Sequence, residues 1–211
     1  MSLLPAWPAF AAFLAAALAV GASPGPGMLY VVARSVGQGR AAGAVSVLGL
    51  SLGSFLNCLA GAFGLSALLA VSPLAYDALR YAGAAYLAYL AYRIATDRGP
   101  VAAPEAGRDG HGRIFRQAVL TNIVNPKSAL FYLSFVPQFI DPARGSVIAQ
   151  FILLGLIFNV GGNSINLIVG LTFGRLGDWL GRHPRAVRVQ RWFTASVLGA
   201  LAATLALAAR R

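Results

Sequence analysis

Long apolar runs separated by short basic segments dominate this chain. Residues 10–29 and 41–73 carry no ionisable side chain apart from the Cys58 thiol, and residues 145–172 carry none at all. Each run reaches the roughly 20 residues that a membrane-spanning helix requires. The chain is 58% hydrophobic and only 11% charged, whereas about a quarter of the residues in soluble domains are charged. The pattern predicts an all-α integral membrane protein, with residues 1–211 forming one membrane domain.

Six membrane-spanning helices fit the pattern, and two of them contain helix-breaking residues. The first predicted span is interrupted at residues 23–27 (Ser-Pro-Gly-Pro-Gly), and the fourth at Asn125-Pro126. Proline removes a backbone hydrogen bond, and in lipid the freed groups are tolerated only where protein or a water-filled cavity satisfies them. One interruption would be explained by a packing kink, whereas two at matching positions favour a site. The predicted spans are residues 8–34, 41–71, 74–95, 115–140, 145–172 and 192–209.

The two halves of the chain match weakly at one constant offset of 102 residues (126 minus 24). A first unit, residues 1–96, and a second, residues 114–211, are joined by the predicted cytoplasmic linker 97–113, which is rich in glycine, proline and charge. Three crossings per unit leave the second unit inverted in the membrane. We therefore predict two inverted three-helix repeats, an architecture typical of transporters with a central site. The offset pairs Pro24 with Pro126, Leu29-Tyr30 with Phe131-Tyr132, Gly53 with Gly155, and Asn57 with Asn159.

The positive charge is distributed as a topology signal. The net charge is +11, and the arginines gather in the first, third and fifth predicted connections, whereas the fourth contains only Arg144. Because cytoplasmic loops carry the excess of basic residues, we predict a bacterial-type inner-membrane protein with both termini periplasmic, although the basic pair Arg210-Arg211 argues mildly against this topology. Short clusters between apolar runs do not form a nucleic-acid-binding surface. The expected partner is the lipid bilayer, with no nucleic acid.

The two interruptions carry most of the candidate substrate-binding residues. Lys127 is the only lysine among the 17 lysines and arginines, and it lies inside the fourth predicted span. An ionisable side chain within a span indicates a functional site by default, although a long stem can also carry the ammonium to the membrane surface. A helix that begins near Gly27 would point free N–H groups at a carboxylate. The predicted binding residues are Pro24, Gly25, Pro26, Gly27, Asn57, Asn125, Pro126, Lys127 and Asn159.

Small and polar residues in the second and fifth predicted spans recur at helical spacing. Asn57 follows Gly49 and Gly53 at intervals of four residues, and Asn159 follows Gly155 in the same way. Small residues let helices approach closely, and an amide among them can bond across the contact. Interhelical bonding and ligand binding therefore both stay open for these amides. The Gly49 and Gly53 face is also the predicted surface for a homodimer.

Asp77 is the one carboxylate predicted to lie within the membrane, so it is the candidate for a proton relay. Arg80 lies three residues further along the same predicted helix, so a structural ion pair is the alternative. Motifs for phosphate binding, zinc hydrolysis or serine nucleophiles are missing, and the single Cys58 cannot form a cysteine metal cage. We therefore predict that the chain is no enzyme and uses no cofactor or metal.

Four segments of the chain resemble one transporter family. They are SPGPGMLYVVARSVGQGRAAG at 23–43, GLSALLAVSP at 64–73, YAGAAYLAYLAYRIA at 81–95 and TNIVNPKSALFYLSFVPQFIDP at 121–142. In order and spacing they are similar to the LysE/RhtB family of amino-acid exporters. The resemblance implies a six-span inner-membrane exporter driven by the proton-motive force. Many such exporters have histidine where this chain has Asn57, so a proton role is not carried over to that position.

Three functions are consistent with these features. The first is a secondary exporter of amino acids or related small zwitterions, with the substrate carboxylate near Gly27 or Lys127. Its ammonium would meet freed carbonyls together with Asn57 or Asn159. The alternative of a different class is a non-transporting scaffold or regulatory subunit whose interruptions are packing kinks. An exporter of another small cation is the third, which the lack of intramembrane cysteine, histidine and carboxylate clusters disfavours.

Overall fold

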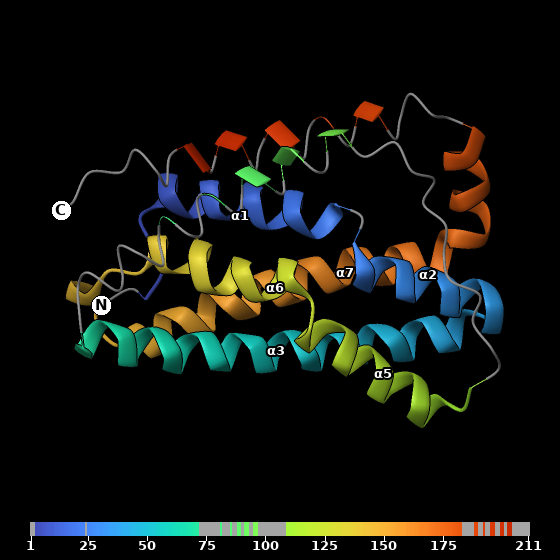
Figure 1. Ribbon diagram of the computed structural model, residues 1–211, viewed down its shortest axis with the longest axis horizontal. Coiled ribbons are helices and arrows are strands. Elements are labelled where there is room, and N and C mark those ends of the chain that lie inside the picture. Colours follow the sequence, from blue (N-terminus) through green and yellow to red (C-terminus); the bar gives the residue numbers. More distant parts are fainter. Residues whose placement is uncertain are drawn as a thin grey trace.

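The computed structural model describes residues 3–23, 25–71 and 109–182, together with scattered residues between 81 and 203. Every ordered element in these parts is helical (Figure 1), which confirms the all-α prediction. The elements are α1 (Trp7–Ala22), α2 (Pro26–Gln38), α3 (Arg40–Val71), α5 (His111–Ile123), α6 (Pro126–Leu130), the π-helical turn η1 (Phe131–Phe135), the 3-10 turns η2 (Val136–Phe139) and η3 (Pro142–Arg144), and α7 (Val147–Arg182).

Two helices in the described residues are long and apolar enough to cross a membrane. They are Arg40–Ser66 within α3 and Val147–Thr172 within α7. Helices α1 and α2 meet at an angle of 49° and count as a third crossing if the bent pair forms one span. The predicted third and sixth spans lie largely outside the described residues, so the six-span count and the inverted repeat stay predictions.

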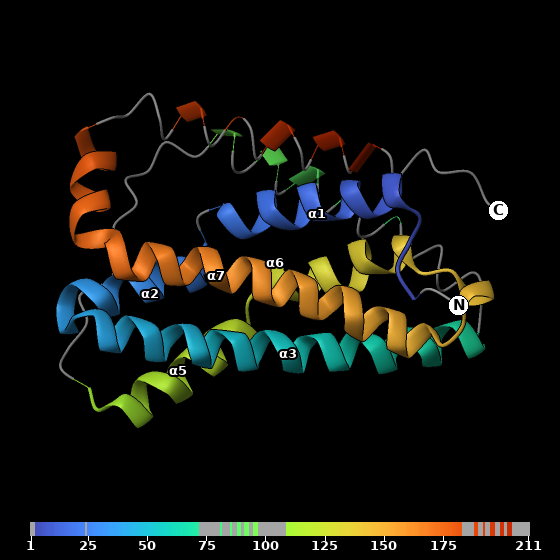
Figure 2. The ribbon, with the colours of Figure 1, turned by 180° about the vertical axis from the view of Figure 1, so that it is seen from behind.

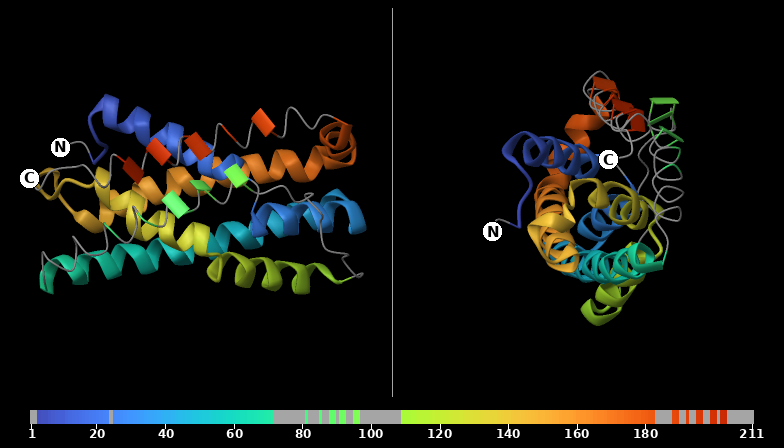
Figure 3. Two further views of the ribbon diagram at one scale, coloured as in Figure 1. Left: turned by 45° about the horizontal axis from the view of Figure 1, so that its top comes forward. Right: turned by 90° about the vertical axis from the view of Figure 1, so that its left-hand side faces the viewer.

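The helices form an elongated bundle around α3 and α7. Helix α3 packs against α2, α5 and α7, and α1 packs against α7. Seen from behind, α7 runs along most of the length of α3 (Figure 2). Helices α1 and α5 lie on opposite sides of the bundle in both views of Figure 3. In the view of Figure 1, the short helix α6 lies between α1 and α3 and in front of α7, and it contacts α3 and α5.

The glycine face of α3 is covered by α5 of the same chain. A Cβ atom on Gly53 would lie 2.6 Å from the Val119 carbonyl oxygen and 2.8 Å from the Asn122 Cβ atom. One on Gly49 would lie 2.6 Å from the Ala118 Cβ atom. Only glycine allows this approach of the two helices. The prediction that this face forms a homodimer is therefore wrong, because α5 occupies it; a homodimer would need another surface.

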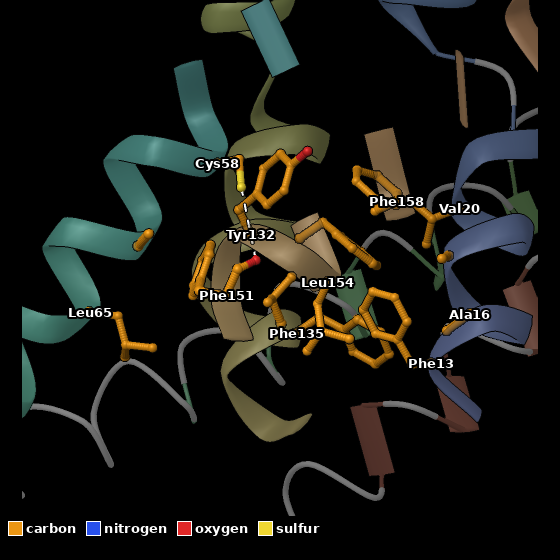
Figure 4. Packing of buried hydrophobic residues seen from close by; sticks show 14 of the residues in the cluster. Phe13, Ala16, Val20, Cys58, Leu65, Tyr132, Phe135, Phe151, Leu154 and Phe158 are labelled. Atoms are coloured by element: carbon orange, nitrogen blue, oxygen red, sulfur yellow. Dashed lines mark hydrogen bonds between the residues drawn. The ribbon is translucent and has the colours of Figure 1, made fainter. Parts of the chain in front are cut away.

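An aromatic cluster fixes α1 against the second half of the chain (Figure 4). The Phe131 and Phe158 rings stack with centroids 3.9 Å apart, and Phe13 of α1 stacks on Phe135 at 6.0 Å. These side chains are buried, as is Tyr132. Because lipid tails are as apolar as the side chains, such contacts stabilise helix association in a membrane through close packing rather than through removal of water. The cluster holds α1 beside η1 and α7.

A polar cluster ties α2 to the start of α5. The Arg34 guanidinium, which is only 6% exposed, pairs with Asp109 at 2.7 Å and donates to Gln117 Oε1 at 2.6 Å. The Tyr30 hydroxyl donates to the Ile114 carbonyl at 3.0 Å, and the Arg34 guanidinium lies 5.3 Å from the Tyr30 ring centre. A buried cation is tolerated because it is paired and hydrogen-bonded. The cluster joins the end of α2 to the predicted linker.

Candidate functional site

Lys127 joins the two places where helices are interrupted. Its ammonium donates to the Val20 carbonyl at 2.9 Å, the Ser23 carbonyl at 2.8 Å and the Ser23 hydroxyl at 3.1 Å. These three acceptors match the three protons that an ammonium offers. Among the described residues, no carboxylate lies within ion-pair distance of Lys127. The positive charge is therefore held by neutral oxygens only.

The acceptors of Lys127 lie at the end of α1 (Val20) and in the first interruption (Ser23), which spans residues 23–25 between α1 and α2 in the structure. Carbonyl groups at the end of a helix lack their usual intrahelical donors, and the helix dipole makes this end negative. The ammonium adds donors and the opposite charge here, beside the Ser23 N–H, which also bonds to the Val20 carbonyl at 3.3 Å. Gly25 makes room for it, because a Cβ atom there would lie 3.3 Å from the Lys127 Nζ atom. Lys127 thus caps a helix that lies more than 100 residues earlier in the chain.

The second interruption, Val124 and Asn125, separates α5 from α6 and is capped by neutral amides. The Asn125 side chain accepts a hydrogen bond of 3.0 Å from the Lys127 backbone N–H and so begins α6 as its N-cap. Asn57 of α3 donates to the Asn122 carbonyl at 3.0 Å, at the end of α5. Asn57 therefore adds a second donor to this carbonyl, which also accepts from the Asn125 backbone N–H at 3.0 Å.

Asn159 belongs to a chain of polar contacts between α3 and α7. It accepts a hydrogen bond of 3.0 Å from the Ser51 hydroxyl and donates one of 3.0 Å to the Ser51 carbonyl. One turn further along α7, Asn163 donates to the Asn159 carbonyl and side-chain oxygen. This pairing accounts for Asn159 as an interhelical contact, as one of the two sequence hypotheses proposed.

A cavity of about 50 Å³ lies where the two interruptions and α7 meet. The first interruption contributes Ser23 and Gly25, the second contributes Asn125 and Lys127, and α7 contributes Asn159. A buried water needs about 10–15 Å³ of such space, so the cavity has room for a few waters but not for an amino acid such as leucine. The structure therefore represents a closed arrangement of these elements.

The predicted binding residues are mostly brought together, with exceptions. Gly27 lines the cavity, while Pro26 and Pro126 are the first residues of α2 and α6. At these positions proline costs no hydrogen bond, because the first N–H groups of a helix have no intrahelical acceptor. Asn57 is joined to the second interruption through the Asn122 carbonyl. Pro24 and the proton-relay candidate Asp77 lie outside the described residues.

The structure adds cavity residues that the sequence analysis did not single out. Ser23 supplies two of the three acceptors for Lys127, and Asn122, Ser54 and Asn163 line the cavity. Asn122 had a recognisable signal, since it lies three residues before Asn125 and thus one helical turn away. Among the described residues, no group of three histidine, cysteine, aspartate or glutamate side chains could hold a metal ion. The cavity instead combines one ammonium with amides, hydroxyls and carbonyls, a set that suits a small zwitterion.

Comparison with known proteins identifies the family. The model of the LysE type translocator matches residues 18–209. The chain belongs to the LysE family. It is 32% identical over 146 residues, covering 69% of this chain and 70% of the relative, to the homoserine/homoserine lactone efflux protein of Salmonella typhi. It is 31% identical over 152 residues, covering 70% and 71%, to the leucine efflux protein of Salmonella choleraesuis (strain SC-B67).

A third relative is described only as a membrane protein. It is an uncharacterized membrane protein of Vibrio cholerae, 31% identical over 179 residues, which cover 84% of this chain and 85% of the relative. No solved structure matches the chain. The LysE family model makes the chain a member of a family of membrane translocators, and the relatives named as efflux proteins are transporters rather than enzymes, which confirms the prediction that the chain is no enzyme.

Proposed function

We propose that this LysE-family chain exports amino acids or closely related zwitterions across the bacterial inner membrane, coupled to the proton-motive force. The single observation that carries the proposal is Lys127, a cation without a described carboxylate partner that borders a cavity between two interrupted helices. A substrate carboxylate is the natural partner for such a cation. The names of the leucine and homoserine efflux relatives support an amino acid as the substrate class.

In the proposed site, the substrate carboxylate competes with the end of α1 for the Lys127 ammonium. All three protons of the ammonium are bonded to Val20 and Ser23 in the closed arrangement. A carboxylate can take one or two of them only if α1 gives them up. The first N–H groups of α2, at Gly27 and Met28, line the same cavity and offer further donors. Substrate binding would therefore loosen the first interruption and enlarge the cavity.

This exchange fits transport by alternating access, in which a central site opens to one side of the membrane at a time. The cavity of about 50 Å³ must widen to admit a substrate, and the interruptions are where the helices can bend. Asp77 stays our candidate for the proton relay, and the proposed topology places both termini in the periplasm. Reporter proteins fused to each terminus test that topology. A C-terminal reporter that is active only in the cytoplasm should be inactive, and its activity would contradict the six-span arrangement.

The decisive test of the function uses proteoliposomes that contain this chain alone. Vesicles loaded with each common amino acid, leucine and homoserine included, are diluted into buffer with or without an imposed proton gradient. We expect gradient-dependent efflux of a small set of amino acids. No efflux of any amino acid from vesicles with correctly folded protein would contradict the proposal and favour a non-transporting membrane subunit.

A further inference from the structure

Asn122 carries a buried oxygen that has no hydrogen-bond donor. The residue is 7% exposed and lies in the last turn of α5, where its side chain lines the cavity. No donor reaches its side-chain oxygen Oδ1, although its backbone carbonyl accepts from Asn57 at 3.0 Å. The side chain is held in place because its Cβ atom packs on the bare backbone of Gly53. The side chain therefore stays at the cavity without a partner of its own.

An unpaired buried carbonyl oxygen destabilises a fold, because the water it has lost is not replaced. The neighbouring donors do not replace that water. The Lys127 ammonium bonds to Val20 and Ser23, the Asn163 amide bonds to Asn159, and no other donor of the described residues lies within hydrogen-bond distance of the Asn122 oxygen. In this arrangement a donor for Asn122 is available only from a molecule that enters the cavity, either water or substrate.

We propose that the side-chain oxygen of Asn122 accepts a hydrogen bond from the α-ammonium group of the exported amino acid. This inference rests on the proposed function and assigns the second end of the substrate. The carboxylate meets Lys127 and the start of α2, and the ammonium meets Asn122, which lies on the other side of the second interruption from Lys127. A neutral amide oxygen suits this role, because it accepts from an ammonium without adding a charge that would hold the substrate too tightly for release.

The test compares an amino acid with its counterpart that lacks the ammonium. The assay measures the transport of labelled leucine, or of whichever amino acid the efflux screen identifies, in proteoliposomes. The inhibition of this transport by the same unlabelled amino acid is compared with the inhibition by its 2-hydroxy acid. We expect the wild-type chain to prefer the amino acid by about 10-fold or more, the size of a hydrogen bond to a charged group. In Asn122→Ala this preference should fall to about 2-fold or less, with a raised half-saturating concentration and a retained maximal rate.

Two further variants make the result specific. Asn122→Asp keeps an acceptor of the same shape and should restore the preference for the amino acid. Gln117→Ala removes an amide from the same helix α5 but outside the cavity lining, where it bonds to Arg34, and should leave the preference as in the wild type. Each variant is first shown to elute as a single species in detergent. If Asn122→Ala does not fold, Asn122→Asp and Asn122→Ser carry the comparison. The preference for the amino acid should be kept in Asn122→Asp and lost in Asn122→Ser, because the shorter serine side chain places its oxygen away from the substrate ammonium.

The outcomes separate this inference from the proposed function. Transport of no amino acid by the wild-type chain would contradict the function itself. Transport with an unchanged preference in Asn122→Ala would overturn only the role of Asn122 and leave its oxygen bonded to water. A third comparison uses the amino alcohol, which lacks the carboxylate of the amino acid. If the wild-type chain prefers the amino acid to the amino alcohol and Asn122→Ala loses this preference, the amide binds the carboxylate, and the inference is overturned.

Discussion

The two interruptions occupy matching places in the chain but are capped by different chemistry. Val20 and Asn122 are 102 residues apart (122 minus 20), and each offers its carbonyl oxygen near the end of a helix. Val20 accepts from the ammonium of Lys127 at 2.9 Å, whereas Asn122 accepts from the neutral amide of Asn57 at 3.0 Å. One helix end is therefore held by a charge and the other by an amide.

The difference indicates which interruption can respond to substrate. A carboxylate competes strongly for an ammonium, because a charge-assisted hydrogen bond is about twice as strong as a neutral one. It gains much less from the amide of Asn57. We infer that substrate loosens the first interruption, whose helix end Lys127 caps from α6, while the Asn57 contact at the second interruption is a fixed part of the structure.

Replacement of Lys127 should have the largest effect on transport. Lys127→Ala removes both the substrate charge partner and the cap of α1, so we expect efflux to fall to the background of empty vesicles while the protein still inserts in the membrane. Efflux from proteoliposomes and elution in detergent measure the two quantities. Wild-type efflux by this variant would contradict the assignment of Lys127.

Gly53→Ala should have the largest effect on stability. The added methyl group would lie 2.6 Å from the Val119 carbonyl and 2.8 Å from the Asn122 Cβ atom, so α5 must move. Overpacking of this kind destabilises by about 1–3 kcal/mol, which thermal melting in detergent detects. Gly64→Ala on the same helix is the matched control, because no described atom lies within 4 Å of its added methyl group. Gly64→Ala should melt at or above the wild-type temperature, because alanine favours a helix more than glycine does, and an equal loss in both variants would contradict the packing explanation.

Asn57→Ala should weaken the second interruption without abolishing transport. The change removes the Asn57 amide, at 3.0 Å, from the Asn122 carbonyl, which keeps the Asn125 N–H as a donor, and it costs about 1 kcal/mol of stability. We expect a lower melting temperature and a reduced but measurable rate of efflux. Complete loss of efflux in a folded Asn57→Ala protein would show that transport depends on the Asn57 contact as strongly as on Lys127, and would contradict the proposed difference between the two interruptions.

Asp109→Asn should have the smallest effect. It removes the charge that pairs with Arg34 at 2.7 Å but leaves the bond of Arg34 to Gln117. Because Asp109 is partly exposed, we expect a loss of about 1 kcal/mol and a lower melting temperature. Asp141→Asn, in the more exposed pair with Arg144, is the control and should melt like the wild type. No difference between the two variants would show that the Arg34 cluster contributes nothing to stability.

The sequence predicted the long helices well, because their apolar runs are continuous. The predicted span 41–71 matches α3, at Arg40–Val71, to within one residue at each end. The predicted span 145–172 begins two residues before α7, which starts at Val147 and continues to Arg182. The π-helical turn Phe131–Phe135 was not predicted. Its side chains Phe131 and Phe135 pack on Phe13 of α1, and such tertiary contacts leave no periodic pattern in the sequence.

The candidate site was predicted residue by residue but not as a set of contacts. Lys127 stood out by its chemistry, yet its partners Val20 and Ser23 lie 107 and 104 residues away. Their meeting depends on how α1 and α6 pack, which spacing along the chain does not encode. The same reason explains the wrong dimer face, since a glycine row predicts close helix contact but does not name the partner helix.

The most direct test of the central claim measures whether substrate loosens the first interruption. Spin labels at the exposed positions Leu18 on α1 and Val124 beside α6, with the buried Cys58 replaced by serine, report the distance between the two elements in proteoliposomes. We predict that a saturating transported amino acid shifts this distance in the wild-type background, and that Lys127→Ala shows the shifted distance without any amino acid. An identical distance distribution with and without a transported amino acid would contradict the account.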